Sequence, residues 1–168
     1  MPLFICCLAS DILDGCSIRI KDPLYFPLRV RFQCSVCRSL GKNFSVFSKG
    51  DEKLEIPGGR GEASYVQKCP ECKNVGSADI LELSMASLGG DTEGSESSVK
   101  ELELAKLDCR GLEPHDFQVG DGWTVCSTSS NTVWEDVSFL EEDSFTEYDE
   151  KASAAVEVTG LKGVWKRI

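Results

Sequence analysis

Two pairs of cysteines constrain this chain more than any other feature of its sequence. Each pair is separated by two residues, Cys34 with Cys37 and Cys69 with Cys72, and 31 residues lie between the pairs. A C-x2-C turn can aim both of its sulfurs at one point, and two such turns can form a tetrahedral cage of four sulfurs. The spacing therefore predicts that Cys34, Cys37, Cys69 and Cys72 bind one Zn²⁺ per chain.

The same four sulfurs leave two alternatives open. An iron–sulfur centre accepts this ligand set, although zinc is the more common occupant of two distant turns. A thioredoxin-like redox role would place one pair at the start of a helix beside a parallel strand, and neither pair is placed so. Zinc held by four sulfurs has no open position for water or substrate, so the site is expected to be structural. Its net charge of −2 can be offset by Arg38, Lys68 and Lys73 beside the cysteines.

The cysteine count bears on the compartment. The chain has nine cysteines, an odd number that excludes a fully paired disulfide framework. No secretory signal is convincing, and no apolar run approaches the roughly 20 residues that cross a bilayer. We therefore expect a cytoplasmic protein, with access to the nucleus left open, and no membrane association. Five cysteines lack metal spacing and are interpreted as buried small apolar side chains: Cys6, Cys7, Cys16, Cys109 and Cys126.

Charge is distributed unevenly along the chain. Residues 1–80 carry 11 Lys and Arg against 9 Asp and Glu, whereas residues 81–168 carry 7 against 19. A negative field repels a phosphate backbone, so nucleic acid is not expected as a partner. The simplest interpretation of the acidic half is a solvated surface.

The pattern of apolar residues is mainly that of β-strands. Residues 28–32 alternate apolar with polar side chains and lead directly into Cys34. Helix signals are weak, with one candidate turn at residues 151–156. Residues 88–98 are rich in Gly, Ser and acid, which predicts a linker or mobile loop. Further strands are expected at residues 44–47, 63–67, 79–84, 102–107, 123–126, 131–134, 137–140 and 156–159.

Three other features could carry function. The run from Gly58 to Gly61 could cradle a phosphate, but a tight hairpin turn fits its composition better. His115 is the only histidine and has no evident catalytic partner. The stretch 135–150 contains eight acids and no base, and it could meet a basic partner. Its candidate partner-surface residues are Asp143, Glu147, Tyr148, Asp149 and Glu150.

Three segments give the chain a resemblance to the eukaryotic CXXC-motif-containing zinc-binding protein family. They are PGGRGEASYVQKCPEC at 57–72, CRGLEPHDF at 109–117 and SFTEYDEK at 144–151, with Cys34 and Cys37 as the upstream pair. The resemblance runs from about residue 24 to residue 151 and more loosely over the N-terminal segment. By motif position it implies that the same four cysteines are the zinc ligands, and it implies no enzymatic activity. His115 stands where the family tends to have an apolar residue.

The resemblance also implies an all-β fold of two similar sandwich- or barrel-like halves packed together, with zinc in the first. We therefore expect a half at 1–88, a linker at 89–98 and an acidic half at 99–168 without a metal site. The favoured function is a non-enzymatic, monomeric protein whose structural zinc holds a scaffold for protein–protein interaction. A metal-handling or cysteine-based redox protein is the alternative. A nucleic-acid-binding zinc ribbon ranks last, because the first half is nearly neutral.

Overall fold

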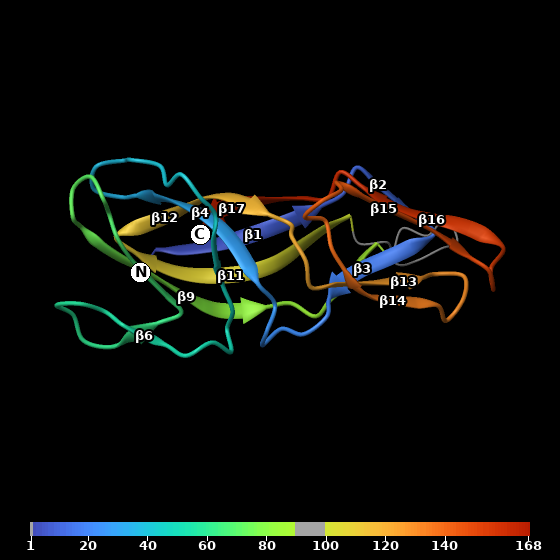
Figure 1. Ribbon diagram of the computed structural model, residues 1–168, viewed down its shortest axis with the longest axis horizontal. Helices are drawn as coiled ribbons and strands as arrows, with labels where there is room; N and C mark the ends of the chain where they lie inside the picture. The colour runs from blue at the N-terminus through green and yellow to red at the C-terminus, as the bar shows by residue number, and fades with distance from the viewer. Residues whose placement is uncertain (1, 90–99) are drawn as a thin grey trace.

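The computed structural model describes residues 2–89 and 100–168, and within these ranges every regular element is a β-strand. Figure 1 shows an elongated molecule in which the strands form two groups along the long axis. All strand pairs are antiparallel. The all-β prediction is thereby confirmed. The described residues contain no helix with the length and apolarity needed to cross a membrane.

The first group of strands contains two sheets and a hairpin. The larger sheet has the order β17-β1-β11-β9-β8, the smaller one has the order β12-β4-β5, and β6 pairs only with β7. The bounds are β1 (Leu3–Ala9), β4 (Leu28–Cys34), β5 (Ser45–Phe47), β6 (Leu54–Glu55), β7 (Glu62–Ala63), β8 (Tyr65–Lys68), β9 (Val75–Leu83), β11 (Glu101–Arg110), β12 (Leu112–Gln118) and β17 (Lys162–Arg167).

The second group contains two further sheets. One has the order β10-β3-β13-β14 and the other has the order β15-β16-β2. The bounds are β2 (Ile12–Asp14), β3 (Cys16–Ile20), β10 (Leu88–Gly89), β13 (Trp123–Ser127), β14 (Val133–Val137), β15 (Ser144–Asp149) and β16 (Ala154–Thr159).

The predicted strand before Cys34 is confirmed as β4. Leu28, Val30 and Phe32 point into the core, while the arginines between them are half-buried on the other face. Alternation of this kind buries one face of a strand and leaves the other for polar contacts. On that outer face Arg31 pairs with Asp116 of β12, and Arg29 lies 3.1 Å from Asp121.

A stack of aromatic rings fills the core between β4, β5 and β8. The ring centroids of Phe32 and Tyr65 are 5.1 Å apart, and those of Phe47 and Tyr65 are 5.2 Å apart. Tyr65 also accepts a hydrogen bond from Ser45 at 2.8 Å and donates one to Gln67 at 2.7 Å. The small sheet and the edge strand β8 are thus joined by side chains rather than by a hydrogen-bonded ladder.

The sheets do not follow the expected division of the chain into halves. β1 pairs with β11, β2 with β16, β3 with β13 and β4 with β12, so strands from before and after the predicted linker share four sheets. The structure therefore does not show two halves that are each continuous in sequence. Of the predicted linker at 89–98, Gly89 belongs to β10, and the remainder lies outside the described residues.

Some local expectations were wrong. Residues 151–153 form a turn and Ala154–Thr159 is strand β16, so no helical turn spans 151–156. The expected strand at 137–140 is absent apart from Val137, which ends β14. Strands β2, β3, β12, β15 and β17 were not predicted. The sequences of the last three mix apolar with charged residues or, in β12, contain a proline, which weakens the alternating pattern.

Asp149 is a correction to the predicted partner surface. Its side chain is 0% exposed, whereas Asp143, Glu147, Tyr148 and Glu150 are exposed. The Asp149 carboxylate accepts hydrogen bonds from the hydroxyls of Ser127, Ser130 and Thr132 and from the amides of Lys151 and Ala152. Asp149 therefore ties the β13–β14 turn to the end of β15 and is not available to a partner.

This network gives a pH-dependent prediction. Hydrogen bonds, first from Ser127 and then from Ser130, lower the pKa of Asp149 to about 2. A lowered folded-state pKa stabilises the fold above the unfolded pKa of roughly 4, and this contribution is lost as the pH falls toward 2. Asp149→Asn should lower the Tm at pH 7 by roughly 5 °C. It should also flatten the Tm profile between about pH 4 and pH 2. Asp143→Asn, at an exposed site, should leave the profile unchanged, and equal effects of the two variants would refute the assignment.

Candidate metal centre

The two C-x2-C turns form two knuckles with matching backbones. In the first, the Cys34 amide donates to Ser39 O at 2.9 Å and the Arg38 amide donates to Cys34 O at 3.0 Å. In the second, the Cys69 amide donates to Asn74 O at 2.8 Å and the Lys73 amide to Cys69 O at 2.9 Å. Arg38 and Lys73 hold the same left-handed conformation, with φ of 66° and 67°. The two turns are therefore superposable units that present cysteines in the same way.

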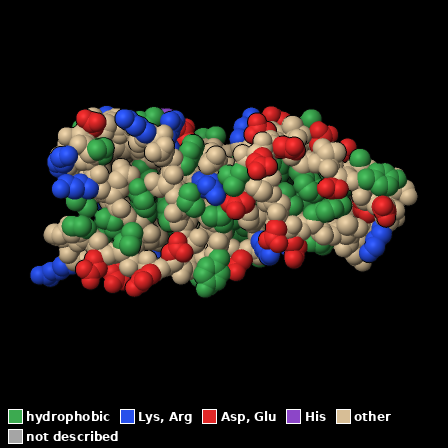
Figure 2. All heavy atoms as spheres, viewed as in Figure 1, with side chains coloured by type: hydrophobic (Ala, Val, Ile, Leu, Met, Phe, Trp, Pro, Cys, Tyr) green, Lys and Arg blue, Asp and Glu red, His purple; other side chains and the backbone are tan. Residues whose placement is uncertain are grey.

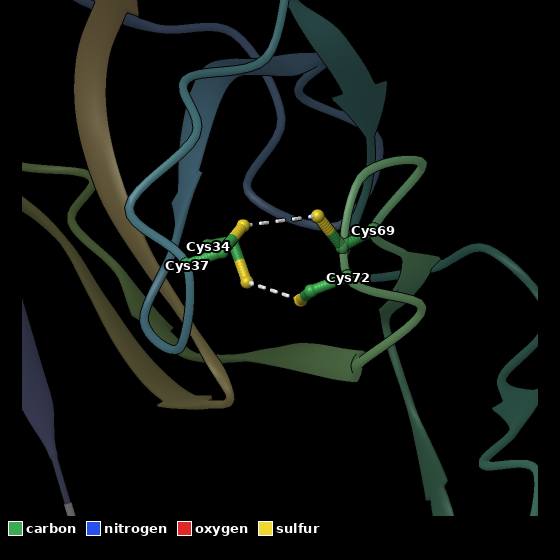
Figure 3. A group of neighbouring side chains, drawn as sticks. All are labelled: Cys34, Cys37, Cys69 and Cys72. Atoms are coloured by element: carbon green, nitrogen blue, oxygen red, sulfur yellow. Dashed lines mark hydrogen bonds between the residues drawn. The ribbon is translucent and has the colours of Figure 1, made fainter.

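The knuckles come from different sheets and face each other. Cys34 ends β4, whereas Cys69 and Cys72 lie in the turn between the paired strands β8 and β9. Figure 3 shows the four side chains converging from the two loops on one central point. A metal ion at that point would link the small sheet to the edge of the five-stranded sheet.

The sulfur positions fit a tetrahedral ion. All four sulfurs lie within 4.8 Å of one another, and Cys34 Sγ to Cys72 Sγ and Cys37 Sγ to Cys69 Sγ are both 3.6 Å. A tetrahedron with Zn–S bonds of ~2.3 Å has sulfurs about 3.8 Å apart. The two separations of 3.6 Å are close to that value and no pair exceeds 4.8 Å, so a modest movement would let the four ligands enclose zinc.

Hydrogen bonds prepare the first cysteine of each knuckle for a metal. The amides of Cys37 and Val36 lower the pKa of Cys34. The Cys72 amide and then the Ser39 hydroxyl lower the pKa of Cys69 to about 6. The Asn74 amide favours the Cys72 thiolate, but burial and the neighbouring sulfurs outweigh it and raise the pKa of Cys72 to about 11. Four thiolates this close repel one another, so a divalent cation is needed to hold all of them deprotonated.

Two residues that the sequence did not single out support the cage. The Ser39 hydroxyl lies 3.1 Å from Cys37 Sγ and 3.3 Å from Cys69 Sγ, and so bridges the knuckles. The carbonyl of Gly111, in the turn between β11 and β12, accepts from the Ser35 amide at 3.3 Å and the Asn74 side chain at 3.1 Å. Gly111 has φ of 74°, and a Cβ there would meet Val75 O at 2.9 Å. The sequence offered one signal for this turn, the glycine directly after Cys109 and Arg110. Tight turns with a positive φ favour glycine.

The Ser39 bridge predicts a measurable loss of affinity. Ser39→Ala should weaken zinc binding by about 10-fold, because it removes a hydroxyl that can donate to either of two ligand sulfurs. The affinity would be measured by competition with a chromophoric chelator. Ser10→Ala is the control, since the Ser10 hydroxyl lies at hydrogen-bonding distance from the carbonyls of Ile12 and Thr159, away from the cage. Unchanged affinity in Ser39→Ala would mean that the hydroxyl plays no part in the site.

The other predicted features lie away from the cage. Cys6, Cys7, Cys16 and Cys109 are buried, while Cys126 is half-buried with its sulfur 3.1 Å from Arg19 Nη1. His115 occupies a bulge in β12 and lies 3.0 Å from the Asp116 carboxylate. The run from Gly58 to Gly61 forms the tip of the β6–β7 hairpin, as its composition predicted.

The basic residues beside the cysteines remain near the cage. Arg38 lies 3.6 Å from Glu113, and the Lys73 amine donates to Pro70 O at 3.0 Å. Figure 2 shows Lys and Arg side chains gathered at the end of the molecule where the knuckles lie. This placement suits the negative charge of a zinc ion held by four thiolates.

Fold and site together define a class: an antiparallel β protein in which two C-x2-C knuckles form one four-sulfur metal centre. The chain belongs to the eukaryotic family described as "CXXC motif containing zinc binding protein", whose model matches residues 15–166. The predicted resemblance is thereby confirmed.

Relatives and solved structures agree with this assignment. The mouse CXXC motif containing zinc binding protein is 34% identical over 127 residues, or 76% of this chain and 75% of that protein. A UPF0587 protein of Caenorhabditis elegans is 29% identical over 168 residues, covering 100% of this chain and 96% of its own. The crystal structure of C1orf123 matches 99% of each chain with a TM-score of 0.80 and 25% identity.

Proposed function

We propose that the chain binds one zinc ion as a structural element and that the scaffold thus held serves protein–protein interaction. The observation that carries this proposal is the closed four-sulfur cage between two sheets. Four sulfurs at tetrahedral separation occupy every position of a zinc ion, so no position remains for water or substrate. That geometry favours a structural role over catalysis at the metal.

The surface argues for a protein partner rather than nucleic acid. Asp143, Glu147, Tyr148 and Glu150 are exposed, and they lie in a part of the chain with a large excess of acids. Acidic side chains attract basic groups and repel phosphates. We propose that these four residues contribute to the partner surface of a monomeric cytoplasmic protein.

A metal-handling role is the second candidate, favoured by one observation. Cys37 and Cys72 are exposed residues, so an acceptor could approach the cage at the second cysteine of each knuckle. Incubation with a weak chelator separates the two roles when zinc and circular dichroism are followed together. A structural zinc stays bound for hours, or leaves only as the fold is lost. Loss of zinc within minutes with the fold intact would overturn the structural role and support metal handling.

Partner binding is tested by affinity capture with wild type and with a variant carrying Cys69→Ser and Cys72→Ser. We expect partners that depend on the zinc-ordered scaffold to be captured by wild type and lost from the variant. A variant with Cys126→Ser controls for the loss of a cysteine outside the cage. Identical capture by all three proteins would contradict a zinc-dependent interaction surface.

A further inference from the structure

A groove of about 410 Å³ lies between the two groups of strands. One wall comes from the end of β12 and the residues after it, with Phe117 and Val119. Another comes from the link between β14 and β15, with Phe139 and Leu140, and Leu161 of the β16–β17 link completes the lining. Figure 1 shows these links in the middle of the molecule, where the two groups of strands meet. Five apolar side chains from three separate segments therefore line the groove, together with polar and charged residues.

Backbone and ring contacts hold the walls in place. The Phe139 amide donates to Gly120 O at 2.8 Å, and the Asp11 amide donates to Gly160 O at 3.3 Å. The ring of Phe117 packs edge-on against Trp165, with centroids 6.5 Å apart. Gly160 has φ of 69°, and a Cβ there would lie 2.3 Å from Asp11 Oδ2. The groove is thus formed before any ligand arrives, which reduces the entropy lost on binding.

The rim of the groove is acidic. Asp11 and Asp143 line it, and Lys162 is the one basic residue of the lining, 3.2 Å from Asp11. The neighbouring Glu141 and Glu142 are exposed beside Asp143. Leu140 is 45% exposed at the same edge. A single exposed leucine is ordinary, but this one lines a preformed groove beside four other apolar side chains and an excess of negative charge. It therefore offers a ligand both burial and charge pairing.

We propose that this groove is the docking site for a partner segment that carries a leucine-like side chain next to Lys or Arg. The proposal rests on the proposed interaction function and specifies its site and the chemistry of the partner. The apolar side chain would enter between Leu140 and Phe117, and the basic side chains would face Asp143, Glu141 and Glu142. The same carboxylates disfavour an anionic membrane or a nucleic acid. Of the acidic surface named above, Asp143 belongs to the groove, while Glu147 and Glu150 do not line it.

The test uses a defined peptide and the full-length, zinc-loaded chain. A fluorescein-labelled peptide Gly-Lys-Lys-Leu-Leu-Lys-Lys-Gly is titrated by anisotropy, beside the same peptide with both leucines changed to serine. We expect the leucine peptide to bind with a Kd below roughly 1 mM and the serine peptide to bind at least 5-fold more weakly, because burial of the apolar side chains is lost. Amide shifts in an ¹⁵N spectrum should move at residues 117–119, 139–143 and 160–162.

Two pairs of variants locate the site. Leu140→Ser and Asp143→Lys should each weaken binding of the leucine peptide by about 5-fold. Leu140→Ser removes buried apolar surface, and Asp143→Lys reverses a charge. Leu24→Ser changes a leucine that is equally exposed at 45%, and Glu52→Lys reverses the charge of an exposed acid outside the groove and outside the proposed partner surface. Both controls should bind within about 2-fold of wild type, since neither touches the proposed contact.

Three results would overturn the proposal. They are no binding of the leucine peptide below 1 mM, equal binding of the serine peptide, and equal losses in the groove and control variants. The last two would indicate attraction by the overall negative field. All four substitutions are at exposed positions, and a melting curve of each variant confirms that it is folded. If the peptide does not bind but partners are still captured in a zinc-dependent way, the groove is not the docking site and the proposed function is unaffected.

Discussion

Replacing both Cys69 and Cys72 with serine should remove the zinc and a large part of the stability of the protein. Metal analysis should fall from one zinc per chain to less than about 0.1, because two ligands cannot retain the ion at the affinity that four provide. Structural zinc sites have apparent binding free energies of ~10 kcal/mol or more. We expect a loss of at least about 5 kcal/mol in the free energy of unfolding, or a decrease of roughly 10–20 °C in Tm.

In this variant the strands that carry the knuckles should lose structure before the rest of the fold does. The knuckles join the sheet of β4 to the edge strand β8, and the aromatic stack and the hydrogen bond from Ser45 to Tyr65 are the other contacts described there. Hydrogen exchange should therefore accelerate most in β4, β5 and β8, while β3 and β13 keep more of their protection. The variant Cys126→Ser is the matched control, because Cys126 lies outside the cage. A double variant that kept its zinc, or lost it without a change in Tm, would contradict this account of the site.

Replacing Trp123 with alanine should destabilise the fold strongly without emptying the zinc site. Trp123 is 0% exposed at the start of β13, its ring packs edge-on against Phe26 at 5.1 Å, and its Nε1 donates to Val119 O at 2.9 Å. Truncation leaves a large cavity and an unpaired carbonyl, which together cost about 4 kcal/mol. The expected decrease in Tm is roughly 8–16 °C.

Zinc content separates this variant from the cysteine double variant. Trp123→Ala should still bind one zinc per chain at 25 °C, because β13 contributes no ligand and belongs to another sheet. Tyr148→Ala is the control, since Tyr148 is 58% exposed and should change the Tm by less than about 2 °C. Loss of zinc in Trp123→Ala under native conditions would mean that the two groups of strands are coupled more tightly than their separate sheets suggest.

The four cysteines of the site could be predicted because their spacing is visible in short segments of the sequence. Two residues between cysteines define a knuckle, and the repetition of that spacing pointed to one cage before any fold was known. The strand that delivers Cys34 was equally evident, since its alternation is regular. Ser39 and Gly111 were not evident. Ser39 looks like any turn serine, and Gly111 reaches the knuckles only because β11 and β12 bring it there.

The arrangement of strands was much less accessible. β1 lies between β17 and β11 in its sheet, and these two strands are about 160 and 100 residues further along the chain. Pairings of this kind depend on burial over the whole fold. They cannot be predicted from the pattern of residues in a short segment. The two expected halves were continuous segments of the chain, whereas the sheets join strands from both sides of the predicted linker.

Asp149 illustrates the same limit for a single side chain. In sequence it is one acid among eight in the stretch 135–150, and nothing local separates it from exposed neighbours. It is buried because Ser127, Ser130 and Thr132, on a turn 17–22 residues away, supply its hydrogen bonds. Whether a carboxylate is buried thus depended on donors that only the tertiary structure assembles.

The central claim, a zinc ion held by four sulfurs, is tested most directly by X-ray absorption at the zinc edge of the purified protein. The account predicts a single shell of four sulfurs at ~2.3 Å and one zinc per chain. A shell containing nitrogen or oxygen at ~2.0–2.1 Å would contradict it, because an open or mixed site could hold water and would no longer be purely structural. An iron signal in place of zinc would contradict it equally.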